Sequence, residues 1–250
     1  SPFRGDDNLL PSDWVSSNVT SGFTSLDGNT RAIDQELERD RYTLGVATKI
    51  GSAWAFESSL SYEEKQGTQD TGAAIFQDAS AGHAAILPQN IDYETIDFNA
   101  SLNFKSEQLL LNSSLFYNEF DNGDDILAWQ NPYNVFGPNV RYPTGVGGLG
   151  VAPDNEYSGG RLLATWFIMP RLRLQMDGSF SLTEQDQNFE PYTINENLSV
   201  SEPLPRTNLD GETKTGTMDL RVFYRPMRKL NLEMWWHGEE RDYTSNRSGY

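Results

Sequence analysis

The chain contains no cysteine and few cationic residues for its length of 250. Without cysteine there is no disulfide, no thiolate metal ligand, no cysteine nucleophile and no C-x-x-C-H site for covalent haem. The 19 lysines and arginines are outnumbered by 36 acids, so the net charge is -17 and the basic stripe of a nucleic-acid-binding protein is missing. Apolar runs also stay short of the roughly 18 residues of a membrane helix. We therefore expect neither a nucleic-acid partner nor a membrane-spanning helix.

Aromatic residues, by contrast, are plentiful, with 6 Trp, 11 Tyr and 13 Phe. The mean hydropathy of -0.60 is typical of soluble or disordered chains, but disordered chains are poor in aromatics. The first residues, Ser1–Gly5, have neither the basic start nor the apolar segment of a signal peptide, and they include no initiator Met. We expect a folded protein that is either processed or an internal piece of a longer chain.

Residues 41–50 alternate strictly between two kinds of side chain. The even positions carry Tyr, Leu, Val and Ile, whereas the odd positions are polar or small. A period of two is the mark of a strand with one apolar and one polar face. Gly51 and Ser52 then supply a tight turn, and residues 54–62 resume the alternation. The pattern predicts a β-hairpin with a very short connection.

The same pattern recurs three more times along the chain. It pairs residues 96–104 with 109–117, 156–169 with 171–183, and 213–225 with 230–243. The sequence thus predicts eight antiparallel strands in four hairpins, with tight turns near residues 51, 106, 170 and 227. The intervening segments read as long polar loops: 66–90, 121–155, 185–212 and, before the first strand, 1–37.

Short turns on one side and long loops on the other are typical of a transmembrane β-barrel. We expect a segment of meandering antiparallel strands, with short periplasmic turns and long extracellular loops. Strands of this length suit it, because a tilted strand crosses a bilayer in about 9–11 residues. We expect residues 1–250 to form part of a single outer-membrane β-barrel domain, with 1–37 as a loop and 38–250 as barrel hairpins. The polar face would line the lumen and the apolar face would meet lipid. Six aromatics near strand ends would form the interfacial girdles: Tyr42, Trp54, Tyr62, Phe104, Tyr117 and Trp236.

Charge is also sorted between the two ends of the predicted strands. The loops 66–90, 121–155 and 185–212 together hold twelve acids and two bases, whereas lysines and arginines flank the short turns. One reading is ordinary solubilising charge. The alternative is an acidic outer surface that binds divalent cations or a cationic partner.

No motif for catalysis or metal binding emerges. His83 and His237 have no recognisable partner ligands nearby. Residues 121–125 resemble the start of a calcium loop, but the twelfth position is Pro132 instead of Glu, so only a loop Ca²⁺ site of another kind stays open. Gly145–Gly150 lacks the strand and helix of a phosphate loop and reads as a loop tip. We expect a non-enzymatic protein with no catalytic residue, no metal site and no cofactor-binding residue.

Several stretches together resemble a known family, the outer-membrane β-barrels that accompany decahaem c-type cytochromes (the MtrB/PioB family). They occur in the expected order over nearly the whole chain: Ser1–Gly5, Leu87–Tyr93 leading into Asp97–Leu102, Trp129–Tyr133, Phe189–Asn195, Leu204–Glu212, Arg225–Pro226 and Leu230–Leu232. Family members are much longer barrels, so the resemblance identifies this chain as an internal segment.

The resemblance implies a sheath for electron transfer across the outer membrane. A periplasmic decahaem c-type cytochrome would thread the lumen and meet an extracellular multihaem cytochrome or a mineral, in metal reduction or oxidation. The haem c would be carried by the partner, with none bound by this chain. Because an eight-stranded barrel is just filled by its own side chains, eight strands that enclose a protein would have to be part of a larger barrel.

On this reading the lumenal polar residues form the partner-facing surface. They are Arg41, Lys49, Glu57, Ser59, Asn99, Ser101, Gln175, Asp177, Asp219, Arg221, Glu233 and His237. Two alternatives remain at this point. An outer-membrane porin or substrate channel would have the same residues facing water, and a soluble carbohydrate-binding module would explain the aromatics but not the alternation of turns and loops.

Overall fold

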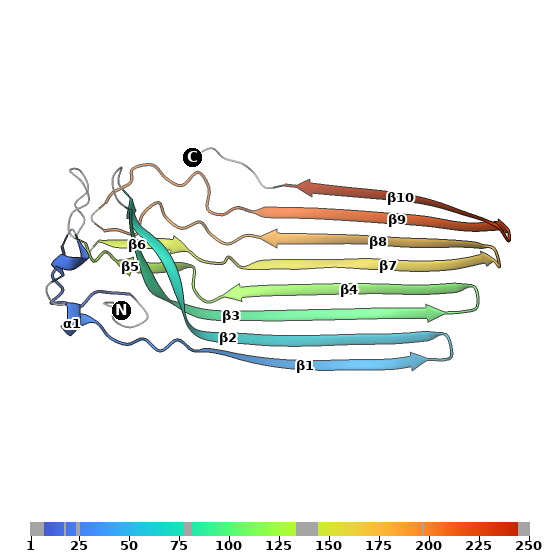
Figure 1. Ribbon diagram of the computed structural model, residues 1–250, viewed down its shortest axis with the longest axis horizontal. Coiled ribbons are helices and arrows are strands. Elements are labelled where there is room, and N and C mark those ends of the chain that lie inside the picture. Colours follow the sequence, from blue (N-terminus) through green and yellow to red (C-terminus); the bar gives the residue numbers. More distant parts are fainter. Residues whose placement is uncertain are drawn as a thin grey trace.

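The computed structural model describes residues 8–17, 19–23, 26–77, 82–133, 145–196 and 198–244. One antiparallel sheet of eight strands dominates it, in the order β1-β2-β3-β4-β7-β8-β9-β10 (Figure 1). The strands are β1 (Leu37–Ile50), β2 (Trp54–Gln77), β3 (Gly82–Lys105), β4 (Leu109–Asn122), β7 (Asn155–Met169), β8 (Leu172–Gln185), β9 (Gly211–Met227) and β10 (Leu230–Tyr243). A separate pair consists of β5 (Ile126–Gln130) and β6 (Val146–Gly150). The helical turns are η1 (Thr20–Gly22) and α1 (Leu26–Asn29). Among all the described residues, no helix is long and apolar enough to cross a membrane.

The predicted fold class is confirmed. The four hairpins are β1–β2, β3–β4, β7–β8 and β9–β10, and their turns at 51–53, 106–108, 170–171 and 228–229 lie together at one end of the sheet. Gly51 adopts a φ of 66°, a conformation that glycine accepts without steric cost. Ser106 closes the second turn by accepting a hydrogen bond from the backbone N–H of Leu109 at 2.9 Å. The sheet is open, because no described strand pairs with the free edges of β1 and β10.

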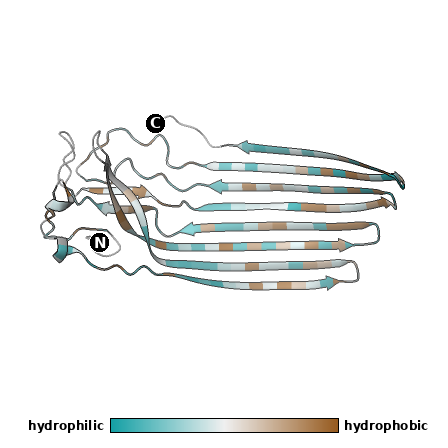
Figure 2. Cartoon of the chain, viewed as in Figure 1, coloured by the Kyte–Doolittle hydropathy of each residue, from teal (hydrophilic) through white to brown (hydrophobic). Residues whose placement is uncertain are grey.

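Strand register sorts the side chains into an apolar face and a polar face. Leu44 lies opposite Leu60, which in turn lies opposite Phe98, and the apolar face consists of these residues and those in line with them. Its side chains are left uncovered, with Leu44 71% and Leu115 60% exposed. Figure 2 shows that hydrophobic residues recur along the strands toward the turn end. An exposed apolar surface of this extent indicates contact with lipid.

All six predicted girdle aromatics lie on this apolar face. Trp54 and Phe104 sit directly opposite each other at the turn end, with ring centroids 4.6 Å apart. The amphipathic indole ring of Trp54 at this level suits the boundary between hydrocarbon and headgroups.

The expectation of a loop over 66–90 is wrong. β2 and β3 each run for 24 residues, which at about 3.3 Å per residue spans roughly 80 Å, far beyond a bilayer. Beyond Gly67 in β2 and before Tyr93 in β3, these strands pair with no other described strand. The reason is that β1 begins opposite Gly67 and β4 ends opposite Tyr93. Gly67 has a φ of 137°, and a Cβ there would lie 1.9 Å from the carbonyl oxygen of Glu36. This extension is rich in small and polar residues, so it lacks the apolar alternation by which strands are recognised.

The predicted loop 121–155 is also partly a sheet. β5 and β6 pair antiparallel within it, so residues 146–150 of the glycine-rich stretch form a strand instead of a loop tip. Its glycines permit close packing: a Cβ on Gly147 would lie 3.1 Å from the Trp129 ring, and one on Gly148 would lie 2.4 Å from the Ile126 side chain. In the described part of segment 185–212, no strand lies between β8 and β9, and a single bridge joins Asn188 to Asn208.

These loop-end segments pack into what we call the cap: residues 8–17, the β2–β3 extension, β5 and β6. Its core comprises Leu10, Ala73, Leu87, Leu127 and Trp129. Asn8 is fully buried and donates hydrogen bonds to the carbonyl oxygens of Pro88 at 3.0 Å and Ala128 at 3.2 Å. Burial at the edge of the cap raises the pKa of Tyr133. Instead of separate loops, the segments therefore form one packed unit at the loop end of the sheet, opposite the short turns (Figure 1).

Candidate functional site: the polar face of the sheet

The candidate site is the polar face, which the register builds from positions alternating with the apolar ones. Ser59 lies opposite Asn99, and Asp177 lies opposite Asp219. All twelve residues predicted to face a partner share this face: Arg41, Lys49, Glu57, Ser59, Asn99, Ser101, Gln175, Asp177, Asp219, Arg221, Glu233 and His237. Their common placement is thus a property of the fold, whereas their contact with a partner stays a prediction.

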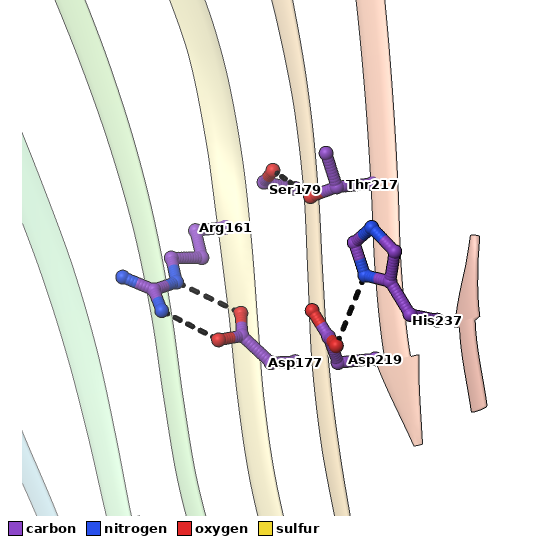
Figure 3. A network of polar contacts seen from close by, with 6 residues as sticks. All are labelled: Arg161, Asp177, Ser179, Thr217, Asp219 and His237. Carbon is purple, nitrogen blue, oxygen red and sulfur yellow. Dashed lines mark hydrogen bonds and ion pairs between the residues drawn. The ribbon is translucent and has the colours of Figure 1, made fainter. Parts of the chain in front are cut away.

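A polar network crosses strands β7 to β10 near the middle of the sheet (Figure 3). Arg161 donates two hydrogen bonds to Asp177, at 2.8 and 2.5 Å. His237 Nδ1 lies 3.1 Å from Asp219 Oδ1. Directly opposed carboxylates repel each other, so Arg161 on one side of the Asp177–Asp219 pair compensates part of this repulsion. The hydroxyl oxygens of Ser179 and Thr217 lie 2.6 Å apart. The network thus comprises six residues: Arg161, Asp177, Ser179, Thr217, Asp219 and His237.

A second charged cluster lies on strands β1 to β3. Arg39 approaches Glu63 at 3.2 Å, and Arg41 lies 3.8 Å from Glu63 and 3.6 Å from Asp97. The Asp97 carboxylate also accepts a hydrogen bond from Asn118 at 2.7 Å. The sequence-based selection missed Arg161, Glu63 and Asp97. Alternation places Glu63 and Asp97 on the polar side, whereas Arg161 is placed there by its pairing with Ser114.

Aromatic rings interrupt the polar face. Phe116 stacks on Tyr157 with ring centroids 5.0 Å apart and an interplanar angle of 28°. The Phe116 ring also covers Gly159, whose Cβ, if present, would lie 2.6 Å from it. Tyr93 and Phe120 make an edge-on contact at 5.1 Å. Phe116 and Phe120 therefore break the alternation of the sequence because they lie on the polar face, not because the strand loses its register.

Metal-binding geometry is not found in the part of the chain with assigned positions: no group of three or more His, Asp or Glu side chains converges there. Two of the acids of 121–125 accept hydrogen bonds from amide side chains of other segments. Asp124 accepts a hydrogen bond from Asn90 at 2.8 Å, and Asp125 accepts one from Gln187 at 2.7 Å. The backbone of His83 belongs to β3, and its side chain lies outside the described residues.

Rows of carboxylates edge the apolar face at its loop end. Asp40 lies opposite Glu64, and Glu64 opposite Glu94. A second row is formed by Glu119, Glu156, Glu184 and Glu212. These charges mark the level at which the outer surface of the strands leaves the hydrocarbon.

An antiparallel sheet with one lipid-suited face, one polar face, short turns at one end and a large cap at the other belongs to the transmembrane β-barrels of outer membranes. The profile of the MtrB/PioB family, outer-membrane beta-barrel porins, matches residues 1–250. The chain belongs to this family and is therefore an outer-membrane protein. The family is one of membrane barrels and not of enzymes.

A curated relative agrees with this assignment. The chain is 27% identical over 158 residues to Outer membrane protein MtrB of Shewanella baltica (strain OS185). The match covers 61% of this chain and 21% of that protein, so the chain spans about a fifth of the relative's length. Of the stretches that carry the resemblance, Ser1–Gly5 lies outside the described residues.

Proposed function

We propose that this protein is a non-enzymatic section of an outer-membrane barrel that encloses a multihaem c-type cytochrome and positions it for electron transfer across the membrane. The haem groups belong to the partner, and this chain has no cysteine with which to attach one. In the proposal, the polar face touches the partner protein and the apolar face insulates the conduit from lipid.

The observation that carries the proposal is the composition of the polar face. Its central charges neutralise one another, as in the pairs Arg161–Asp177 and Arg41–Asp97. Between these pairs lie small polar residues and partly exposed aromatics such as Tyr157, which is 40% exposed. Protein interfaces are enriched in tyrosine, phenylalanine and arginine. Such a surface suits a protein occupant better than a stream of ions.

The open sheet supports a large barrel. Unpaired strand edges are not tolerated against lipid, so β1 and β10 require neighbours. An interior wide enough for a folded protein needs many more than eight strands, in the range of about twenty or more. Similarity to the Shewanella baltica outer-membrane protein over a fifth of its length is consistent with this size.

The competing function is a diffusion porin or substrate channel, in keeping with the description of the family. A porin keeps a water path with charged rings, whereas a sheath is closed by its occupant. We would extract the complete protein from its native outer membrane in mild detergent, purify it by a tag, and record the haem Soret absorbance and its redox response. Stoichiometric haem that co-migrates with the barrel supports the sheath. A haem-free barrel that conducts ions in a planar bilayer refutes it.

A further inference from the structure

The turn end of the sheet is basic although the chain as a whole is acidic. Segments 47–57, 103–111, 166–175 and 221–235 hold three acids, Glu57, Glu107 and Glu233. The same segments hold eight bases: Lys49, Lys105, Arg171, Arg173, Arg221, Arg225, Arg228 and Lys229. Because short turns of such barrels face the periplasm, this end is the periplasmic mouth.

Five of these basic residues lie on the polar face of the sheet. Lys49 lies opposite Ala55, Lys105 opposite Leu110, and Arg221 opposite Gln175, all on the polar side of the sheet. Arg173 lies opposite Phe223, and Arg225 follows two residues later on the same side. We call these five residues the basic mouth: Lys49, Lys105, Arg173, Arg221 and Arg225.

Among the described residues at the same level, the apolar face carries no charged side chain. Its residues there are Ile50, Trp54, Phe104, Trp166, Tyr224 and Leu232. Phospholipid headgroups reach a barrel from its outer, lipid-facing side. The headgroups would therefore meet aromatic and aliphatic side chains. Because the basic mouth lies on the opposite, polar face, lipid phosphate groups are not expected to be its ligand.

The bases of the mouth are also unneutralised. Within the segments that have assigned positions, no carboxylate lies at ion-pair distance from any of the five, whereas Arg39, Arg41 and Arg161 nearer the loop end all have one. The guanidinium group of Arg173 lies over the Phe223 ring, 4.3 Å from its centroid. Arg225 donates a hydrogen bond to the carbonyl oxygen of Arg228 at 2.9 Å.

These contacts orient two arginines without consuming their charge. A groove of about 800 Å³ runs past them and is lined by Phe167, Arg173, Phe223, Arg225 and Glu233, among others. Guanidinium groups bind carboxylates bidentately, and their affinity is greatest where no internal carboxylate competes. The groove and the unpaired bases together form a surface for an anionic group.

We propose that the basic mouth binds a carboxylate-rich surface on the protein that occupies the lumen, and that it thereby sets which end of that protein faces the periplasm. This inference rests on the proposed function for the existence of such an occupant. The outer end of the barrel section is acidic, with twelve acids and two bases in segments 66–90, 121–155 and 185–212. An anionic surface is repelled there and attracted at the mouth, so the charge asymmetry orients the occupant.

The test compares two triple variants of the complete protein, expressed with its native partners and extracted from the outer membrane. The mouth variant is Lys49→Gln, Arg173→Gln and Arg221→Gln. The matched control, Lys65→Gln, Lys214→Gln and Arg241→Gln, removes the same charge from the loop end of the sheet. A third variant, Arg173→Lys and Arg221→Lys, preserves the charge of the mouth.

Two quantities are measured. The first is the haem retained per barrel during washes of rising NaCl concentration, and the second is the affinity of the extracted protein for fluorescent poly-L-glutamate. Removing three unpaired charges should weaken both the haem complex and poly-L-glutamate binding by about tenfold at low salt. The difference should vanish near 0.5 M NaCl, where charges are screened within a few ångströms. The control should lose about twofold or less. The charge-preserving variant should fall between wild type and the mouth variant, because lysine keeps the charge but not the bidentate geometry of arginine.

The outcomes separate the two proposals. If wild type retains haem and the mouth variant matches the control in both readouts, the basic mouth is refuted and the sheath stands. If wild type carries no haem, the sheath is refuted, and no lumenal protein covers the mouth of the extracted barrel. Direct poly-L-glutamate binding then tests the anion affinity of the mouth alone: tenfold weaker binding to the mouth variant supports that affinity, and equal binding overturns it.

Discussion

The assignment of the two faces predicts opposite effects for arginine at adjacent positions of β1. Val46 lies on the apolar face, 57% exposed, in line with Ser58 and Ala100 near the middle of the apolar band. Ala47 lies on the polar face, directly opposite Glu57. Val46→Arg therefore places a charge in the hydrocarbon, whereas Ala47→Arg places the same charge beside a carboxylate.

The expected loss of folding free energy depends on how deep the substituted residue lies in the bilayer. Arginine at the bilayer midplane of a β-barrel costs about 2–4 kcal/mol, falling to about 0–1 kcal/mol near the interfaces. At about 1.4 kcal/mol per factor of ten, Val46→Arg should lower the ratio of folded to unfolded protein by roughly 30-fold to 700-fold. Ile50 lies four residues nearer the turn, about 10 Å along the membrane normal for a strand tilted near 40°. Ile50→Arg should accordingly cost about 1 kcal/mol or less.

The assay is urea-dependent folding of the complete protein into lipid vesicles, followed by tryptophan fluorescence, with outer-membrane protein levels in cells as a second measure. Ala47→Arg is the matched control, because it shares the backbone environment and the added side chain. Equal loss of stability in Val46→Arg and Ala47→Arg would show that the faces are wrongly assigned. Equal loss in Val46→Arg and Ile50→Arg would show that the depth scale is wrong.

Three further substitutions probe particular contacts. A double-mutant cycle with Arg161→Gln and Asp177→Asn should give a coupling of about 0.5–1 kcal/mol in vesicle unfolding, since both side chains are partly solvated; a coupling near zero would mean that the bidentate pair does not persist. Gly67→Ala should destabilise by more than about 1 kcal/mol, because it combines a positive φ with a backbone collision, whereas Gly72→Ala, with open space around its Cβ, should change unfolding little. Asn8→Ala should cost the cap about 1–3 kcal/mol by removing two hydrogen bonds, seen as faster proteolysis near β5 with unchanged membrane insertion; unchanged proteolysis would contradict the packing of the cap.

The amino-acid sequence by itself determined the membrane part of the fold. Because side chains alternate with a period of two, the run from Tyr42 to Ile50 already states which residues share a face. Gly51 and Pro170 mark turns by their own conformational preferences. Once consecutive strands pair as hairpins, the polar face follows without further information, which is why its twelve predicted members lie together.

Only the tertiary structure decided what depends on non-local pairing. Alternation does not show that β4 skips β5 and β6 to pair with β7, nor that Asp177 and Asp219 lie opposite each other. The β2–β3 extension and the cap were missed for the same reason. Their strands are held by each other and by a core collected from residues as distant as Leu10 and Trp129, so no local period reveals them. Register between strands is a property of the pair, and it exists only when both strands are in place.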